Sequence, residues 1–354
     1  MYRQRYNNSY QRNNNAPRFG RSTGRGKREV KSFNPIDLIS QANNVQQKPQ
    51  AAPFTPVHTF SDFPISDQLK NNIAARGFTQ PTPIQDQVIP HLLAGRDVIG
   101  IANTGTGKTA AFLIPLIEKI VKNRNGKVLI VAPTRELAVQ IRDDLFALAR
   151  GLQIYSVLCI GGTNMFRQRN DLRRPYNFVI GTPGRLKDLI QDKSLAIGAF
   201  QTVVLDETDR MVDIGFLPDI KFIVSFLPKN RHSLFFSATV DGRVREILHS
   251  FVQNPVTVSV KTQETAEGIE QNIIKVLNKH AKIDLLHDLL IKEDFSKVLI
   301  FGRTKWGVQK LSDELVKRGF KADAIHGNKR QNQRQRTLDR FKRSEIQILL
   351  ATGM

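Results

Sequence analysis

Short apolar runs alternate with longer amphipathic stretches from about Phe60 onward. Between most of these runs lie helical patterns, such as Arg135–Ala149 and Arg243–Phe251. Near-continuous apolar strands separated by helices are typical of a parallel sheet that helices cover on both faces. The pattern therefore predicts an α/β fold. The predicted strands are Asp97–Ile101, Lys127–Ala132, Gln153–Ile160, Asn177–Ile180, Thr202–Leu205, Ser233–Phe236 and Val256–Val260.

A polar stretch at residues 261–268 interrupts this alternation and is predicted to be a linker between a first domain, 58–260, and a second, 269–354. The alternation then resumes, but the second unit is short for a doubly wound domain. Its predicted strands are Gln271–Leu277, Lys297–Phe301, Ala322–Ile325 and Ile346–Ala351, and its predicted helices are Lys282–Ile291, Lys305–Arg318 and Gln331–Phe341.

Residues 1–57 differ from the rest of the chain in being rich in Arg, Asn, Gln and Gly. Seven Arg and three Lys stand against one Glu and one Asp, a net charge of 10 − 2 = +8. Such a segment buries too little apolar surface to offset its ordering entropy, so we expect a disordered tail. Arg interspersed with Tyr suits loose RNA contact, and an inert solvated tail is the alternative. The short apolar stretch Phe33–Ile39 is a candidate docking helix.

The net charge of +21 and the pI near 10.2 indicate a polyanionic partner, most simply nucleic acid, although basicity also serves solubility. The single cysteine, Cys159, lies in an apolar run and is predicted to be a core residue. With no disulfide within the chain, we expect a reducing compartment and a cytoplasmic location, or a nuclear one in a eukaryote. No apolar run approaches the roughly 18 residues of a membrane-spanning helix, and the polar N-terminus does not resemble a secretory signal.

A glycine-rich loop follows the first predicted strand and leads into a helix. Strand, loop ending in Gly-Lys-Thr and helix together predict a phosphate-binding loop, in which backbone N–H groups turn toward an anion. Lys108 would reach the β- and γ-phosphates, and the Thr109 hydroxyl would bind Mg²⁺. The alternative is an ordinary glycine-rich turn. The loop comprises Ala102, where the general pattern has Gly, then Asn103, Thr104, Gly105, Thr106, Gly107, Lys108 and Thr109.

The strand Thr202–Leu205 ends in acidic residues. In an open parallel sheet, ligands bind at the carboxyl ends of the strands, so Asp206 is placed to hold Mg²⁺ directly or through water. Glu207 is placed to orient and polarise an attacking water. For this acidic pair alone, the alternative is a solvated acidic turn. Together with the phosphate-binding loop upstream, the pair is a more specific indication of a metal site.

From Phe60 to Thr352, the sequence resembles the DEAD-box RNA helicases. The acidic motif of that family is similar to Asp206-Glu207-Thr208-Asp209. The other resembling segments are Gly77–Gln85 with the upstream aromatic Phe60, Pro133–Ala138, Gly161-Gly162, Thr182–Arg185, Ser237–Thr239, Val298–Arg303 and Gln331–Arg334.

The resemblance implies two RecA-like domains, the second incomplete, that use ATP and Mg²⁺ to separate short RNA duplexes. It implies catalytic roles for Lys108, Asp206 and Glu207, and adenine contacts for Phe60, Phe78 and Gln85. It further implies that Asp209, Ser237, Ala238 and Thr239 couple the ATP site to RNA. The implied RNA contacts are Pro133, Thr134, Arg135, Gly161, Gly162, Thr182, Pro183, Gly184, Arg185, Arg303, Gln331, Arg334 and Thr352. Such backbone contacts carry little base specificity.

Two departures from the family pattern stand out. Thr208 replaces the usual Ala, which leaves the acidic residues in place. The chain ends at Gly353-Met354, before the arginine-rich motif with which the family continues, so we expect weak turnover and weak unwinding. The alternative functions are a non-catalytic ATP- and RNA-binding module and a DNA translocase, against which Gly77–Gln85 and Thr182–Arg185 argue.

Overall fold

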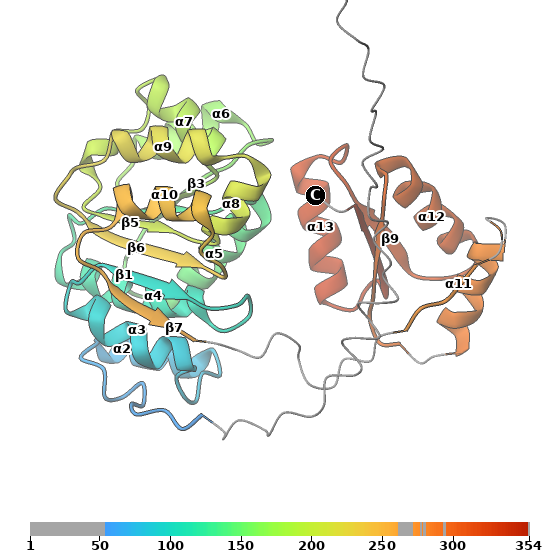
Figure 1. Cartoon of the computed structure of the whole chain (residues 1–354), viewed down its shortest axis with the longest axis horizontal. Coiled ribbons are helices and arrows are strands. Elements are labelled where there is room, and N and C mark those ends of the chain that lie inside the picture. Colours follow the sequence, from blue (N-terminus) through green and yellow to red (C-terminus); the bar gives the residue numbers. More distant parts are fainter. Residues whose placement is uncertain (1–53, 261–271, 277, 279–280, 293–294, 353–354) are drawn as a thin grey trace, which may run out of the picture. The chain divides into compact units, whose positions relative to one another are not determined.

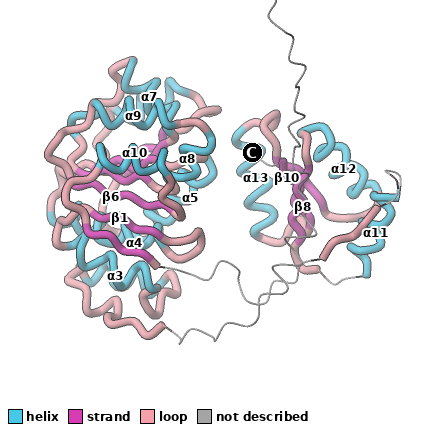
Figure 2. The backbone as a smooth tube through the Cα atoms, viewed as in Figure 1, coloured by secondary structure: helices cyan, strands magenta, loops and turns pink. Residues whose placement is uncertain are grey.

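The computed structural model describes residues 54–260, 272–276, 278, 281–292 and 295–352. Most of the predicted tail, including Phe33–Ile39, and the predicted linker 261–268 lie outside these residues. The described residues form one larger and one smaller parallel sheet with helices, so the predicted α/β fold is confirmed (Figures 1 and 2). No described helix is both long enough and apolar enough to cross a membrane.

The larger sheet has the strand order β3-β4-β2-β5-β6-β1-β7, and all of its strand pairs are parallel. Each apolar run that predicted a strand in this domain contains one, with ends shifted by a few residues. The third strand begins later than predicted because Gln153 adopts a positive φ of 54°, which is incompatible with an extended strand. The strands are β1 (Val98–Ile101), β2 (Val128–Val131), β3 (Ser156–Cys159), β4 (Phe178–Gly181), β5 (Thr202–Leu205), β6 (His232–Ser237) and β7 (Val256–Ser259).

Helices cover both faces of this sheet, and alternate strand residues pack into two separate cores. Val204 and Phe236 face one core, while Val203 and Phe235 face the other. The first core is covered by α2 (Asp67–Ala75), α3 (Pro83–Leu93), α4 (Lys108–Lys122) and α5 (Arg135–Leu148). The second is covered by α6 (Met165–Leu172), α7 (Pro183–Gln191), the short 3-10 helix η1 (Ile197–Ala199), α8 (Thr208–Ile214), α9 (Leu217–Ser225) and α10 (Gly242–Phe251).

The smaller sheet has the strand order β8-β10-β9 and is also parallel. Its strands are β8 (Val298–Gly302), β9 (Ala322–Ile325) and β10 (Ile348–Thr352), and its helices are α11 (Ala281–Lys292), α12 (Lys305–Lys317) and α13 (Gln331–Lys342). The predicted strand Gln271–Leu277 is wrong, since residues 272–276 are not in a strand. An apolar β-rich run becomes a strand only when a neighbour pairs with its backbone, and no described strand does so here.

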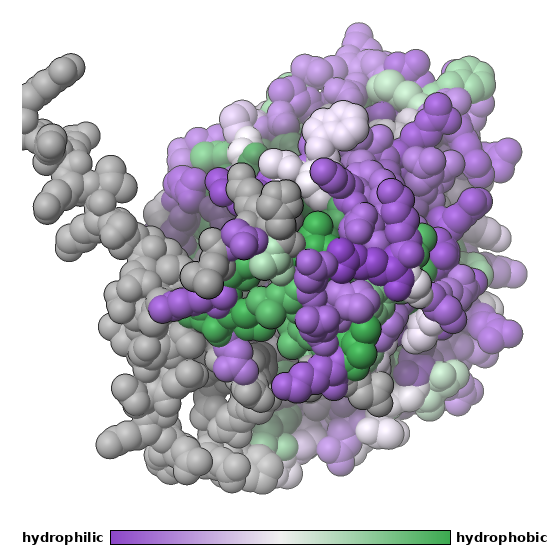
Figure 3. All heavy atoms as spheres, turned by 90° about the vertical axis from the view of Figure 1, so that its right-hand side faces the viewer, coloured by the Kyte–Doolittle hydropathy of each residue, from purple (hydrophilic) through white to green (hydrophobic). Residues whose placement is uncertain are grey.

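Strand β8 lies at an edge of the smaller sheet and carries exposed apolar side chains. Leu299 is 50% exposed and Phe301 68%, and both lie on the same face of the strand. Figure 3 shows apolar surface gathered on this side of the smaller domain, where Leu285 and Ile291 of α11 are also exposed.

Candidate nucleotide and nucleic-acid site

The strand order divides the carboxyl edge of the larger sheet into two contiguous stretches. Strands β5, β6 and β1 are neighbours, and the chain after them forms what we call the nucleotide edge: residues 206–209, 237–239 and 102–109. Strands β3, β4 and β2 are also neighbours, and the chain after them forms the basic edge: residues 161–162, 182–185 and 133–135. Segments far apart in the sequence are therefore brought together by sheet topology alone.

The phosphate-binding loop has the shape that its glycines predict. Gly105 and Gly107 adopt φ values of 81° and 93°, a region that disfavours residues with a side chain. A Cβ on Gly107 would also come within 2.5 Å of Gln85 Nε2. Helix α4 begins directly after this glycine, so its N-terminal N–H groups point into the loop. Lys108 is buried, and its Nζ donates to the Ala102 carbonyl at 2.6 Å.

Gln85 ties helix α3 to this loop. Its Oε1 accepts from the Thr82 backbone N–H at 3.0 Å, and its Nε2 donates to the Gly107 carbonyl at 3.1 Å. Gln85 is 4% exposed, so it is a buried residue of α3 and not one of its surface positions. The amide holds the start of α3 against the last turn of the loop.

Two of the three predicted adenine contacts are aromatic, and they lie together. The rings of Phe60 and Phe78 stack with centroids 6.3 Å apart, and Phe63 meets Phe60 edge-on at 6.2 Å. Phe60 is buried within this cluster, while Phe78 remains partly exposed. The cluster is an apolar surface of the kind on which a planar base packs.

Asp206 is a buried carboxyl group at the end of β5. Its Oδ1 accepts the Glu207 backbone N–H at 3.0 Å. Burial raises the pKa of Asp206 to about 7, against the opposing effect of the Lys108 ammonium. A divalent cation would hold this carboxyl ionised, and together with the Thr109 hydroxyl it supplies the hard oxygen ligands that Mg²⁺ prefers. Among the described residues, no group of three or more His, Cys, Asp or Glu is arranged to hold a metal ion.

Glu207 occupies a strained turn beside Asp206. Its φ of 49° and ψ of 52° are left-handed, a conformation that costs a non-glycine residue roughly 1 kcal/mol or more. The turn ends β5 and begins α8. The Glu207 carboxylate is paired with Arg210 Nη1 at 3.2 Å, a contact that the sequence analysis missed although it follows helical i,i+3 spacing.

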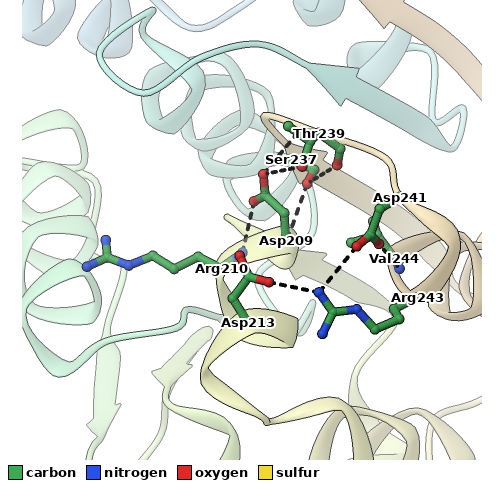
Figure 4. Close-up of polar contacts among 8 residues, drawn as sticks. All are labelled: Asp209, Arg210, Asp213, Ser237, Thr239, Asp241, Arg243 and Val244. Atoms are coloured by element: carbon green, nitrogen blue, oxygen red, sulfur yellow. Dashed lines mark hydrogen bonds and ion pairs between the residues drawn. The ribbon is translucent and has the colours of Figure 1, made fainter. Parts of the chain in front are cut away.

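Asp209 links the acidic turn to the end of β6 (Figure 4). Its Oδ2 accepts the backbone N–H groups of Ala238 and Thr239 at 3.2 and 2.9 Å and the Thr239 hydroxyl at 3.0 Å. In return, Ser237 Oγ accepts the Asp209 N–H at 3.2 Å and donates to the Thr239 carbonyl at 2.7 Å. These hydrogen bonds join the acidic turn firmly to the end of β6.

Two further contacts hold α8 against β6 and against α10, and neither was predicted. The buried Thr208 hydroxyl donates to the Phe236 carbonyl at 3.3 Å. The Arg243 guanidinium lies between Asp213 at 3.0 Å and Asp241 at 3.4 Å (Figure 4). No local sequence pattern indicates the Thr208–Phe236 and Arg243–Asp213 contacts, because the partners are 28 and 30 residues apart.

The basic edge is built from guanidinium groups and exposed backbone. Arg135 lies against the glycine pair: a Cβ on Gly161 would come within 3.0 Å of its Nη2, and one on Gly162 would collide with its Nη1. Arg185 Nη1 lies 3.5 Å from the Thr163 carbonyl. Guanidinium groups beside exposed backbone are the kind of groups that bind the phosphates of a nucleic-acid strand.

The threonines and prolines of the basic edge also lie at the starts of helices α5 and α7. Thr134 Oγ1 accepts the Leu137 N–H at 3.2 Å and so caps α5. Thr182 precedes α7, and Pro183 occupies its first turn, where its missing N–H is harmless. Pro133, Thr134, Thr182 and Pro183 are buried, so only part of each can meet a ligand.

Four predicted RNA contacts belong to the smaller sheet. Arg303 directly follows β8 and Thr352 ends β10, and the pairing of Thr352 with Gly302 brings these two together at one edge. Gln331 begins α13 and Arg334 lies in its first turn, after the loop that follows β9. All four therefore lie beyond the carboxyl ends of strands.

A parallel sheet with a strand–glycine loop–helix unit and a buried aspartate on a nearby strand defines the chain as a phosphate-loop nucleotide-binding protein. Comparison with known families narrows this class. The DEAD/DEAH box helicase family matches residues 82–247, and the helicase conserved C-terminal domain family matches residues 281–354.

Individual relatives agree with the family matches. The ATP-dependent RNA helicase CshA of Limosilactobacillus reuteri is 39% identical over 83% of this chain and 60% of that protein. The protein of the same name from Listeria monocytogenes is 41% identical over 83% of this chain and 57% of that protein. The crystal structure of a DEAD box protein from the hyperthermophile Methanococcus jannaschii is 34% identical, with a TM-score of 0.56, over 83% of this chain and 80% of that chain.

The chain belongs to the DEAD-box RNA helicase family. It spans 57–60% of the length of the two curated relatives described above.

Proposed function

We propose that this chain is an ATP-dependent RNA helicase, in which RNA stimulates ATP hydrolysis and hydrolysis drives local separation of RNA duplexes. The observation that carries the proposal is the placement of the nucleotide edge and the basic edge side by side on one sheet. The names of its relatives support the same activity.

On the nucleotide edge, residues 102–107 would surround the phosphates with backbone N–H groups, and Lys108 would exchange its bond to Ala102 for the β- and γ-phosphates. Thr109 and Asp206 would hold Mg²⁺, which supplies charge neutralisation on the phosphates. Glu207 would accept a hydrogen bond from the attacking water and so orient it. Phe60, Phe78 and Gln85 would recognise adenine.

On the basic edge, Arg135 and Arg185 would bind phosphates of one RNA strand, and Gly161, Gly162 and Gly184 would let that strand approach the backbone. Such contacts position RNA without distinguishing its bases. We assign Arg303, Gln331, Arg334 and Thr352 to a second set of RNA contacts on the domain 269–354, with residues 261–268 as its linker to the domain 58–260.

Asp209, Ser237, Ala238 and Thr239 would couple the two edges. A change in the position of Glu207 and Asp209 around ATP would be passed to the end of β6 through the four hydrogen bonds that join Asp209 to residues 237–239. In this way occupancy of one edge would alter the other.

Steady-state ATP hydrolysis by the full chain, with and without single-stranded RNA, tests the proposal. We expect RNA to raise the rate, the Glu207→Gln variant to abolish it, and RNA to compete better than DNA of the same sequence. ATP and RNA binding with no hydrolysis would favour a non-catalytic binding module instead, and preference for DNA would favour a translocase.

A further inference from the structure

Asp86 is a buried carboxylate that none of the predicted site roles uses. It follows Gln85 on α3 and is 3% exposed. Its Oδ2 accepts the Val57 backbone N–H at 2.8 Å, and its Oδ1 accepts the His58 N–H at 3.1 Å and meets His58 Nδ1 at 2.7 Å. A buried carboxylate is costly unless it is fully hydrogen-bonded, so these contacts hold the donors firmly.

The donors belong to a segment of residues 54–60 that we call the arm, which leads directly into the aromatic cluster. The Val57 side chain is 84% exposed, so the protein holds this residue by its backbone. Thr59 then turns the chain by donating its N–H and hydroxyl to Asp62 Oδ2 at 2.7 and 2.8 Å. Phe60 comes next and packs between Phe63 and Phe78. Asp86 thus fixes the chain just before the ring of Phe60.

The first turn of α3 therefore makes two different attachments. Successive residues of a helix point about 100° apart, so Gln85 and Asp86 face different neighbours. Gln85 bonds to the phosphate-binding loop at Gly107, and Asp86 bonds to the arm. One helical turn consequently sets the position of Phe60 relative to the loop that would hold the phosphates.

We propose that Asp86 is a positioning residue for adenine recognition: by clamping the arm it places Phe60 and Phe78 where the base of a bound nucleotide packs. This inference rests on the proposed ATP site. With the clamp removed, the arm gains conformational freedom, and nucleotide binding must then order it again. The loss falls on contacts to the base, whereas contacts of the triphosphate with the loop are kept. The rings alone pack against either purine, and it is Gln85 that offers hydrogen-bonding groups to the edge of the base. By fixing the rings relative to Gln85, Asp86 therefore sets how well the adenine edge meets that amide, and with it the preference for adenine over guanine nucleotides.

The test measures equilibrium binding of fluorescent ATP and GTP, with Mg²⁺, to the full chain. In Asp86→Asn the shape is kept, but the charge is lost and an amide N–H₂ opposes the arm's donors. We expect the ratio of ATP to GTP affinity to fall about tenfold, equivalent to about 1.4 kcal/mol, through ATP alone. Val57→Pro removes one donor at an exposed position outside any helix. We expect the ratio of ATP to GTP affinity to fall roughly threefold in this variant, because two contacts to Asp86 remain.

Thr55→Pro is the matched control, since it makes the same backbone change in the arm at an exposed residue that does not contact Asp86. We expect it to leave both affinities unchanged. An unchanged ATP-to-GTP ratio in Asp86→Asn and Val57→Pro would overturn the inference. So would an equal loss of ATP and GTP binding, which would indicate a merely structural role. If the unmodified chain bound neither nucleotide, the proposed function itself would fail.

Discussion

The nucleotide edge and the basic edge occupy the same sheet, yet their polar groups are held in different ways. On the nucleotide edge, Lys108 and Asp206 are buried and bonded to other protein groups, and so is Gln85 of α3, which bonds to this edge at Gly107. On the basic edge, Gly162 is exposed, and the guanidinium of the neighbouring Arg135 makes no hydrogen bond within the part of the chain that the structure describes. A buried, interlocked site is preorganised for one ligand, whereas an open edge of cations and bare backbone accepts any strand with phosphates.

Under the proposed function, the two ligands would therefore be selected by different physical interactions. The nucleotide edge would select by shape and by hydrogen bonds in a low-dielectric setting, where each lost partner is expensive. The basic edge would select by charge, so its affinity should depend on salt. Four experiments follow, and the first two test this contrast directly.

The largest effect is expected for Lys108→Ala, which removes a buried ammonium from the phosphate-binding loop. We expect ATP hydrolysis to fall by roughly 10²–10³, and RNA affinity in the absence of nucleotide to stay within twofold. Hydrolysis assays and RNA filter binding measure the two effects. A parallel loss of RNA binding would mean that the edges are not separable.

The reciprocal change is Arg135→Ala on the basic edge. We expect RNA affinity to fall roughly tenfold and the salt dependence of binding to become shallower, with ATP affinity unchanged. Arg142→Ala is the matched control, because Arg142 lies on the same helix, α5, but pairs with Asp143 instead of lying against the glycine pair. Equal effects of the two substitutions would contradict a specific role for Arg135.

A pH experiment concerns the opposite edge of the sheet, where the strands begin. There His232 Nε2 meets the Arg96 carbonyl at 2.8 Å, and its Nδ1 lies 3.3 Å from Lys119 Nζ. Burial and the Lys119 charge lower the pKa of His232 from 6.5 to about 4. Between these values the unfolded chain binds a proton that the folded chain does not, so stability is complete above pH 6.5 and declines as the pH falls toward 4.

Urea denaturation at pH 7, 5.5 and 4.5 measures this decline, which we expect to reach roughly 1–2 kcal/mol for this group. His232→Gln should be less stable at pH 7 and should lose stability less steeply below it. A variant with the slope of the unmodified chain would show that other groups cause the acid sensitivity.

The smallest effect is expected for Thr208→Val, which keeps the side-chain shape but removes the hydroxyl that bonds to the Phe236 carbonyl. Leaving that carbonyl without a donor should lower the free energy of unfolding by about 1 kcal/mol. Thr208→Ser keeps the hydroxyl and should recover most of the loss. The measurement is again urea denaturation, and equal stabilities of the Val and Ser variants would argue against this hydrogen bond.

The sequence predicts most of the first domain because its signals are local. Each apolar run there contains a strand, and Thr82-Pro83 and Gly95 bracket α3, whose bounds are Pro83–Leu93. The predicted strand at 271–277 is wrong because a β-rich sequence forms a strand only when another strand pairs with it, and that pairing depends on the rest of the fold.

The site is predictable as far as its motifs are contiguous. Lys108, Asp206 and Gln85 stand in recognisable segments, and the structure brings their segments together. The roles of Asp86 and Arg243 were not predictable, because each acts through a partner about thirty residues away. An isolated Asp or Arg looks like an ordinary surface charge until tertiary structure shows what it touches.

The central claim is that the two edges form one ATP- and RNA-coupled device. The most direct test is the affinity of the full chain for single-stranded RNA, measured with and without a non-hydrolysable ATP analogue and Mg²⁺. We expect the analogue to tighten RNA binding at least fivefold, which corresponds to a coupling free energy of about 1 kcal/mol, and Asp209→Ala to remove the effect. Tight binding of both ligands with RNA affinity unchanged by the analogue would contradict it.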